Sequence, residues 1–396
     1  MNKVILNNIK TFIKSILSMI VDYFTISKPL VINNKTLLIV KIDGIGDYIL
    51  FRNYLEVIRK SEQFKDYKIT LCGNSVYKEL AEAYDKKYVD EFIWIDIKKL
   101  SFVMKHFKNI QYRYNTLRTI SKKGFEIAIQ PTYSRDFWVG DTLIKASHAK
   151  QRIGSRGDYT CIKSWQKRLS DRWYTKLVTA SALPLSEIKR NAEFFQNLGL
   201  FSSTALKPVL KVILDTGKNY NENNYYILCP GAGLIKRFWP LEHFAELAKR
   251  IHSTTGWTCV ICGARDETHL GQKLMDLTDV PMNNIAGVTS LSELVTIISK
   301  AKLVVSNETS VIHIAAAIGT PSICILGGGH YGRFMPYENE TNMSQRLPVT
   351  VIHKMDCFMC NWQCKYKTQE DTPFPCIKAI SVDDVWIQMK VLIEHI

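Results

Sequence analysis

Four short turns in the chain carry residue types suited to proton transfer or anion binding, and the first follows the apolar run of residues 36–42. It reads Gly44-x-Gly46-Asp47. A carboxylate at this position either caps the helix that follows, by accepting backbone N–H groups at its positive end, or acts as a general base. Because the spacing is not Gly-x-Gly-x-x-Gly, the turn lacks the dinucleotide-binding fingerprint.

The second turn, residues 230–240, combines glycines with two basic side chains. Gly231 and Gly233 let the backbone approach a ligand. Lys236 or Arg237 can neutralise phosphate oxygens at the start of the helix that follows. A solvated basic loop is the alternative interpretation.

The third turn, residues 306–310, offers hydroxyls and an acid at another helix start. Thr309 and Ser310 stand where hydroxyls and backbone N–H groups receive an anion. Glu308 can accept hydrogen bonds from sugar hydroxyls. His313 follows in the first helical turn, where it is either a ligand or a packed structural residue.

The fourth turn, residues 263–267, ends on two acids, Asp266 and Glu267, after an apolar run. Either acid can bond a ribose hydroxyl, as acidic residues do in nucleotide-binding α/β folds. The turn therefore adds a candidate nucleoside contact to the candidate phosphate contacts.

The ten cysteines divide into two groups. Six lie within or beside apolar runs and are expected to be small buried hydrophobes in a reducing compartment. The other four follow the spacing Cys357-x2-Cys360-x3-Cys364-x11-Cys376. The Cys-x2-Cys pair is typical of metal sites but the overall spacing is not a standard zinc ribbon, so structural iron or zinc and plain thiols both remain open.

Composition and charge limit the class of protein. The 396 residues are 46% hydrophobic and 22% charged, which excludes a disordered or collagenous chain and favours two domains. Lys and Arg number 52 against 37 acids, and the formal charge of +15 indicates phosphate-rich partners: nucleotides, nucleic acid or anionic lipid.

Residues 98–123 contain many cations, no acid and several aromatic rings. Such a stretch is either a solvated face or a surface for an anionic glycolipid. With Gly46, the residues expected to contact an acceptor there are Lys98, Lys99, Arg113 and Arg118.

Apolar runs and helical patterns alternate from residue 36 to residue 130 and again from 225 to 326, as in parallel sheets covered by helices on both faces. We therefore expect an α/β protein with two doubly wound, Rossmann-like domains facing a central ligand cleft. The expected segments are an N-terminal amphipathic helix (1–35), a first domain (36–205), a linker (206–224), a second domain with the Cys-rich segment (225–380) and a C-terminal helix (381–396).

The N-terminal segment is neither a convincing signal peptide nor a membrane span, because Lys10 and Lys14 interrupt its apolar stretch. Apolar residues recur there at helical spacing. The helix either lies on a membrane surface or packs on its own domain.

These blocks, in their order KIDGIGDYIL, PGAGLIKRFWPLEHFAEL, the run from IAGVTSLSEL to PSICILG, and the Cys-rich end, resemble glycosyltransferase family 9, the ADP-heptose heptosyltransferases, over residues 36–390. The resemblance implies a GT-B fold and an inverting mechanism that requires no cofactor or catalytic metal. It implies Asp47 as catalytic aspartate, Lys236 as phosphate lysine and Glu267 as ribose acid. Thr309 and His313 match the donor-binding loop.

Glu308-Thr309-Ser310 departs from the family's usual Asp-Thr-Gly, which leaves the donor sugar open. Some relatives that glycosylate autotransporters hold iron through four such cysteines, whereas many core heptosyltransferases have similar cysteines with no metal attributed.

The function expected from the resemblance is transfer of a heptose, or a similar sugar, from an ADP-heptose-like nucleotide sugar to an anionic lipopolysaccharide core acceptor. It would take place in the cytoplasm at the inner-membrane surface, with no nucleic-acid partner. One alternative is a protein O-heptosyltransferase acting on an autotransporter. Another, of a different class, is a basic nucleic-acid-binding protein.

Overall fold

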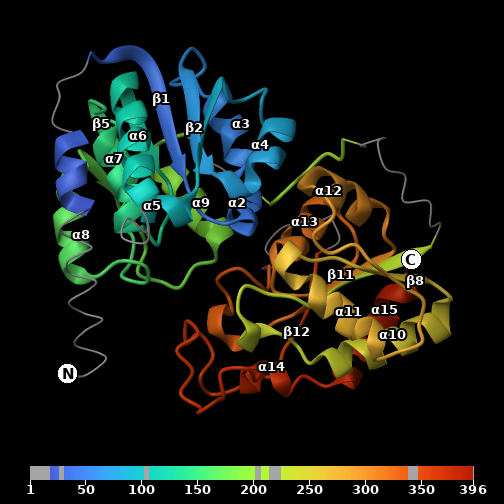
Figure 1. The fold of residues 1–396 in the computed structure, drawn as a ribbon. Coiled ribbons are helices and arrows are strands. Elements are labelled where there is room, and N and C mark those ends of the chain that lie inside the picture. Colours follow the sequence, from blue (N-terminus) through green and yellow to red (C-terminus); the bar gives the residue numbers. More distant parts are fainter. Residues whose placement is uncertain are drawn as a thin grey trace. The chain divides into compact units, whose positions relative to one another are not determined.

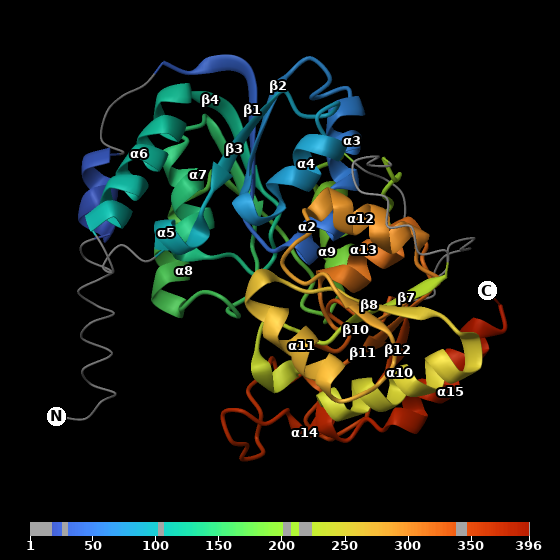
Figure 2. The same cartoon turned by 45° about the vertical axis from the view of Figure 1, so that its right-hand side comes forward.

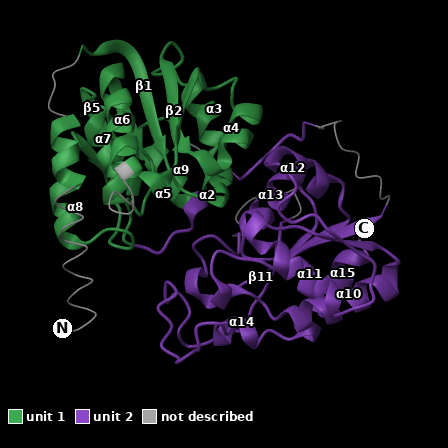
Figure 3. Ribbon diagram, in the orientation of Figure 1, with its two compact units in different colours: residues 1–182, 189–206 green, residues 183–188, 207–396 purple. Residues whose placement is uncertain are grey.

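The computed structural model divides the chain into two compact units, shown in Figure 3. Unit 1 comprises residues 1–182 and 189–206, and unit 2 comprises residues 183–188 and 207–396. The residues that the structure describes are 18–25, 31–101, 107–200, 207–213, 224–337 and 347–395. The expected N-terminal helix (1–35) and linker (206–224) therefore lie partly outside the described residues.

Unit 1 contains a six-stranded sheet in the order β3-β2-β1-β4-β5-β6, and every pair of neighbouring strands in it is parallel. Buried β1 is central, with Leu37 paired to Ile69 on one side and to Ile127 on the other. The strands are β1 (Asn33–Lys41), β2 (Lys68–Asn74), β3 (Glu91–Ile95), β4 (Phe125–Gln130), β5 (Gln151–Ser155) and β6 (Lys176–Val178).

Helices cover both faces of this sheet (Figure 1). Leu38 and Val40 of β1 pack in one core cluster with Leu117 and Leu143, so α6 and α7 cover that face. On α9, Phe195 stacks on Tyr54 of α3. The helices and helical turns are α2 (Ile45–Phe51), α3 (Asn53–Lys60), η1 (Ser75–Tyr77), α4 (Lys78–Tyr84), α5 (Ile97–Ser101), α6 (Phe107–Lys123), η2 (Phe137–Asp141), α7 (Thr142–Ala146), α8 (Ser164–Ser170), η3 (Asp171–Trp173) and α9 (Glu187–Asn197).

Unit 2 repeats the architecture with a second parallel sheet, in the order β12-β11-β10-β7-β8-β9. Buried β10 lies beside β7, with Val304 paired to Ile227. The strands are β7 (Tyr225–Cys229), β8 (Thr258–Ile261), β9 (Met282–Asn284), β10 (Leu303–Asn307), β11 (Ser322–Ile325) and β12 (Val349–Val351).

The helices of unit 2 also form two layers. Figure 2 shows α12 and α13 on one side of the second sheet and α10 and α15 on the other. The helices and turns are η4 (Ile235–Arg237), α10 (Leu241–Thr255), η5 (Arg265–Glu267), α11 (Thr268–Asp276), α12 (Leu291–Lys300), α13 (Ser310–Ile318), η6 (Gly328–His330), α14 (Pro375–Lys378) and α15 (Val382–Ile393). The expected class, α/β with two doubly wound sheets, is confirmed. The strands of each sheet are parallel, so all their carboxyl ends lie at the same edge of that sheet. The first turn therefore lies at this edge of the unit 1 sheet, and the other three turns lie at this edge of the unit 2 sheet.

Arg113 of α6 is a buried structural residue, which corrects the expectation that it contacts an acceptor. Its guanidinium has no exposed surface. Nε and Nη2 donate to the Asp22 carboxylate at 2.7 and 2.8 Å, and Nη1 donates to the carbonyl oxygens of Leu100 and Trp138 at 2.9 and 2.8 Å. With its donors committed and no exposure, Arg113 fastens the helical residues 18–25 to unit 1.

The same short helix keeps apolar side chains in solvent. Ile20, Tyr23 and Phe24, three and four residues apart, are exposed, while Asp22 is buried. The helix therefore packs on its domain through one face and presents an apolar face outward. Among the described residues, we find no helix that is both long and apolar enough to cross a membrane.

We expect Arg113→Ala to lower the free energy of unfolding by about 3–5 kcal/mol, because removing one partner of a buried ion pair leaves the other charge uncompensated. Arg118→Ala is the matched control on the same helix, since Arg118 is exposed and its guanidinium donates a 2.7 Å hydrogen bond to the Tyr114 hydroxyl one turn away. Denaturant unfolding followed by circular dichroism measures both. Equal losses for the two variants would contradict a structural role for Arg113.

Candidate functional site

In unit 1, Asp47 lies in the first turn of α2, directly after the carboxyl end of β1. The N-cap residue of that helix is Gly44, which has no side chain to cap it, and a Cβ built on Gly44 would lie 3.5 Å from Asp47 Oδ2. Asp47 is half-buried. The turn thus holds a partly accessible carboxylate over a glycine at the edge of the sheet.

A second carboxylate, Asp43, lies at the same edge of the unit 1 sheet. It is not among the site residues predicted from the sequence. Its Oδ2 lies 2.7 Å from Nζ of the buried Lys41 and accepts a hydrogen bond of 2.7 Å from Thr132, after β4. Asn74, at the end of β2, donates to the Asp43 carbonyl at 3.1 Å. Asp43 therefore ties together the carboxyl ends of three neighbouring strands, and an acid directly after an apolar strand was the available signal.

Tyr77 lies within the electrostatic influence of both carboxylates. Its hydroxyl donates to the Lys41 carbonyl oxygen. Burial, followed by the charges of Asp43 and Asp47, raises the pKa of Tyr77 well above its ordinary value. Both carboxylates therefore act on one buried phenol, which stays protonated at neutral pH.

In unit 2, the central feature is a buried ion pair between Arg237 and Glu308. Arg237 Nη2 donates to Glu308 Oε2 at 2.9 Å and to the Glu308 carbonyl oxygen at 3.0 Å. The Glu308 side chain is 6% exposed. The pair joins η4, which follows β7, to the carboxyl end of β10, so the second and third turns meet at one point.

The desolvation cost of burying the Glu308 carboxylate is larger than the stabilisation that its pairing with Arg237 provides. Its Oε1 is buried and makes no hydrogen bond with any residue that the structure describes. Burial raises the pKa of Glu308 to about 7, although the Arg237 and Arg333 charges act to lower it. The carboxyl is therefore poised to exchange a proton near neutral pH.

Thr309 and Ser310 form the start of α13, beside this pair. Thr309 is the N-cap residue, yet its side chain makes no capping bond. Its hydroxyl lies 3.0 Å from the Ser306 hydroxyl instead. The first N–H groups of an α-helix have no partner within the helix and attract anions. The start of α13 therefore suits a phosphate group next to Arg237.

Glu267 lies against Gly231. A Cβ on Gly231 would overlap the Glu267 carboxylate, so glycine here makes room for the acid. Glu267 Oε2 also accepts a hydrogen bond of 2.8 Å from the Ala264 N–H, and burial raises its pKa. The structure thus brings the second and fourth turns together.

Gly233 is exposed, with open space around the position of a Cβ.

Lys236 points to a different neighbour from Arg237. Its Nζ donates to the Thr368 hydroxyl at 3.1 Å and lies 5.8 Å from the centre of the Phe374 ring. Of the two cations that the sequence offered, Arg237 is the one joined to the third turn. The sequence could not separate them, because they are neighbours in a single three-residue turn.

His313 is a packed residue in α13. It is 5% exposed, and its Nδ1 lies 2.6 Å from the Tyr337 hydroxyl. Burial lowers the pKa of His313 to about 4, so the ring is neutral at physiological pH. His313 can contribute packing and a neutral hydrogen bond but no charge.

The remaining basic residues expected to meet an acceptor are on the surface of unit 1. Lys98, Lys99 and Arg118 are exposed, and Lys99 pairs with Asp96 at 3.1 Å. Gly46 is half-buried in α2 next to Asp47. Leu100 of α5 and Asp22 bond the same Arg113, so the cations of α5 neighbour the helix that exposes Tyr23 and Phe24.

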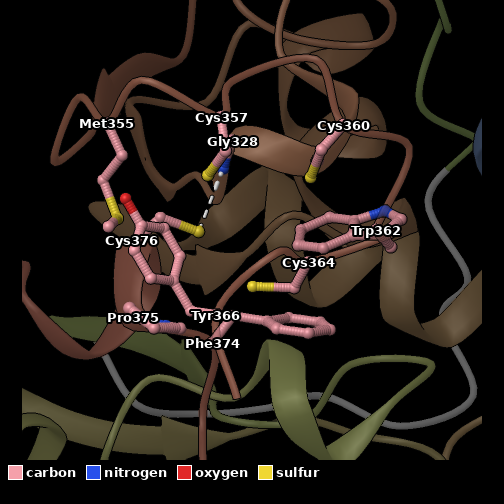
Figure 4. A pocket seen from close by; sticks show the side chains of 11 residues that line it. Gly328, Met355, Cys357, Cys360, Trp362, Cys364, Tyr366, Phe374, Pro375 and Cys376 are labelled. Atoms are coloured by element: carbon pink, nitrogen blue, oxygen red, sulfur yellow. Dashed lines mark hydrogen bonds between the residues drawn. The ribbon is translucent and has the colours of Figure 1, made fainter. Parts of the chain in front are cut away.

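The four C-terminal cysteines line one small pocket of about 10 Å³, shown in Figure 4 with Cys357, Cys360, Cys364 and Cys376 around it. However, no group of three or more His, Cys, Asp or Glu side chains among the described residues is arranged to hold a metal ion. Burial raises the pKa of the Cys376 thiol, and its sulfur accepts a 3.4 Å hydrogen bond from the Gly328 N–H. The structure thus brings the four cysteines to one pocket, and the choice between a structural metal and plain thiols stays a prediction.

Comparison with known proteins relates the chain to sugar transferases. Residues 172–361 match the model of glycosyltransferase family 9 (heptosyltransferase). Lipopolysaccharide heptosyltransferase 2 from Escherichia coli K12 is 33% identical over 105 residues, which are 25% of this chain and 30% of that protein. The matched segment thus spans less than a third of this relative's length.

Solved structures share the fold over almost the whole chain. A family 9 glycosyltransferase from Veillonella parvula gives a TM-score of 0.68 at 18% identity, covering 92% of this chain and 99% of that one. E. coli ADP-heptose heptosyltransferase II gives 0.63 at 15% identity, covering 91% and 99%. The iron-containing dodecameric glycosyltransferase TibC from enterotoxigenic E. coli gives 0.53 at 11% identity, covering 93% and 78%. The GT-B class expected from the sequence is confirmed.

The ion pair generates a pH prediction. The Glu308 pKa is about 7 in the folded protein against an ordinary 4.5, so the folded state holds this proton more tightly. The associated stability is fully present below about pH 4.5 and is lost as the pH rises through about 7. We expect the melting temperature of the wild type to fall relative to Glu308→Gln over this range. Glu62→Gln, which changes an exposed carboxylate, is the control, and a wild-type curve parallel to that of Glu308→Gln would be the contrary result.

Proposed function

Since the chain is a relative of the glycosyltransferase family 9 enzymes, we propose that it transfers a heptose, or a similar sugar, from a nucleotide sugar of the ADP-heptose type to an acceptor hydroxyl. The observation that carries this proposal is the meeting of Arg237, Glu308 and the start of α13 at the carboxyl edge of the unit 2 sheet. A cation next to uncapped helix N–H groups suits a diphosphate. Glu267, on the turn that follows β8, suits a ribose hydroxyl.

Arg237 takes the main phosphate role in this proposal, in place of Lys236. A guanidinium has five N–H donors, and the two hydrogen bonds to Glu308 use one nitrogen, Nη2. Its other face and edges suit diphosphate oxygens. As the sugar–phosphate bond breaks, negative charge gathers on the leaving diphosphate, and Arg237 with the N–H groups of Thr309 and Ser310 stabilises it.

Glu308 then serves the donor sugar. Its Oε1 is buried and has no hydrogen-bond partner in the described chain, so it can accept from a sugar hydroxyl without displacing Arg237. A buried acceptor that lacks a partner carries a free-energy cost that such a hydroxyl removes. The longer acid in Glu308-Thr309-Ser310 thus suits a sugar with a hydroxyl in reach of that oxygen.

Asp47 supplies the base in unit 1. It accepts the proton of the acceptor hydroxyl as that oxygen attacks the anomeric carbon from the face opposite the nucleotide, which inverts the configuration. Its half-buried place over Gly44 supports this role, because the carboxylate keeps access to a substrate. The neighbouring Asp43, paired with Lys41, holds the turn in place.

For the acceptor, we propose an anionic glycolipid of the lipopolysaccharide core at the cytoplasmic face of the inner membrane. Exposed Tyr23 and Phe24, beside the α5 cations Lys98 and Lys99, offer an apolar and basic surface of the kind that binds anionic lipid. A protein serine hydroxyl remains the second candidate acceptor. Incubation with lipid-linked and peptide acceptors in parallel separates the two.

We expect Asp47→Asn to keep nucleotide binding and to lower the rate of sugar transfer by about 10² to 10⁴, because only the base is removed. Single-turnover transfer measures the rate, and calorimetry with ADP measures binding. Asp66→Asn, at an exposed aspartate whose Oδ2 lies 4.0 Å from Lys35 Nζ, is the control. Transfer by Asp47→Asn at the wild-type rate would rule out this base.

The two neighbouring cations make a second test of the donor site. We expect Arg237→Met to weaken ADP binding by about tenfold or more, since a charge-assisted hydrogen bond is worth about 1.5–3 kcal/mol. Lys236→Met, on the same turn, should have a smaller effect. Calorimetric titration of both variants with ADP gives the comparison, and the reverse order of effects would return the main phosphate role to Lys236.

A further inference from the structure

The Cys-rich segment, residues 355–376, is hydrogen-bonded to two loops at the edge of the unit 2 sheet. The N–H groups of Met359 and Asn361 donate to the carbonyl oxygens of Gly328 and Gly329 at 2.8 and 2.9 Å. At its other end, the Phe374 N–H donates to the Lys236 carbonyl oxygen at 2.7 Å. The segment is therefore bonded to both the loop after β11 and the turn that carries Arg237.

Three successive glycines make this close approach possible. A Cβ on Gly327 would lie 2.8 Å from Trp362 Cη2, a Cβ on Gly329 would overlap the Trp362 ring, and one on Gly328 would overlap the Phe358 ring. Two aromatic rings of the Cys-rich segment thus occupy the space that side chains on this loop would need. The glycine run after β11 is explained by these rings.

The segment keeps its rings there at a conformational cost. Met359, Asn361 and Trp362 have φ angles of 66°, 50° and 60°, in the left-handed region. This conformation costs about 1–2 kcal/mol for a residue other than glycine, and asparagine tolerates it better than most. Backbone in these regions persists where the surroundings over-determine it, and it gathers at functional sites.

The ring held in this way lies against the donor cation. The Arg237 guanidinium lies 4.6 Å from the centre of the Trp362 ring, and its Nη2 bonds Glu308. Trp362 in turn stacks on Phe374, with ring centres 5.4 Å apart at 24°. The guanidinium therefore contacts both an indole and a carboxylate, at a distance typical of a cation–π contact.

We propose that Trp362 is a positioning residue of the donor site, which holds the Arg237 guanidinium against Glu308 and so makes the Cys-rich segment part of the nucleotide-binding apparatus. This inference rests on the proposed function for its effect on the donor. The contact itself does not depend on which sugar is transferred. An arginine side chain loses conformational entropy when it binds a ligand. Because the indole face already limits the positions open to Arg237, less of this entropy is lost when the donor binds.

Donor binding gives the first test. We expect Trp362→Leu to raise the Kd for ADP by about tenfold, since a partly desolvated cation–π contact is worth roughly 1–2 kcal/mol. Trp362→Phe keeps a ring face and should restore most of the affinity. Trp165→Leu, at an exposed indole in unit 1, is the matched control. Far-UV circular dichroism confirms that each variant is folded.

A second readout needs no donor. If Trp362 holds Arg237 on Glu308, its loss weakens the charge that lowers the Glu308 pKa, so Glu308 binds its proton up to higher pH. Cys324 on β11 and Arg333 after η6 are the other ionisable groups that act on Glu308, and neither is changed. The drop in melting temperature caused by Trp362→Leu should therefore be larger at about pH 8 than at about pH 5.

The double variant Trp362→Leu/Glu308→Gln completes the cycle. We expect the pH-dependent part of the drop to disappear in the Glu308→Gln background, leaving only the lost packing. A drop that is equal at both pH values and in both backgrounds would overturn the inference. Failure of the wild type to bind ADP or to use any nucleotide sugar would overturn the proposed function, and the thermal cycle would still decide the role of Trp362.

Discussion

The buried pair between Arg237 and Glu308 is the interaction on which the proposed donor site depends. Burying two charges has a desolvation cost that their attraction often only balances, so such a pair is weak evidence for stability. Here it joins the turn after β7 to the end of β10 and leaves one carboxylate oxygen of Glu308 without a hydrogen-bond partner in the described part of the chain. A pair that is incompletely satisfied and lies at the carboxyl edge of a parallel sheet is better explained by ligand binding than by folding.

Much of the scaffold could be read from the sequence, because long apolar runs flanked by turn residues are strong signals. The apolar run of residues 36–42 is confirmed as strand β1 (Asn33–Lys41), with ends that differ by a few residues, and the alternation from residue 225 to residue 326 is confirmed as the second sheet with its helices. The short strands β5, β6 and β12 were not predicted, since three to five residues such as Gln151–Ser155 carry little periodicity. After β1, the chain forms two helices, α2 and α3, that meet at Arg52, a division that the helical pattern alone does not reveal.

The site was harder to predict than the scaffold, because it depends on side-chain direction. The choice between Lys236 and Arg237 is set by the rotation of one short helical turn, which spacing does not reveal. Arg113 was interpreted as a surface cation, although Leu117 and Ile120 follow it at helical spacing on the buried face of α6. That spacing was the available signal. The family match covers residues 172–361, mostly in unit 2, so the donor half of the proposal has the broader support.

The most direct test of the account is a crystal structure of the full chain with ADP bound. We expect diphosphate oxygens within hydrogen-bond distance of the Arg237 guanidinium and of the N–H groups at the start of α13, with the ribose on Glu267 and the indole of Trp362 still stacked on Arg237. A nucleotide bound in unit 1, or one whose diphosphate contacts neither Arg237 nor α13, would contradict the account.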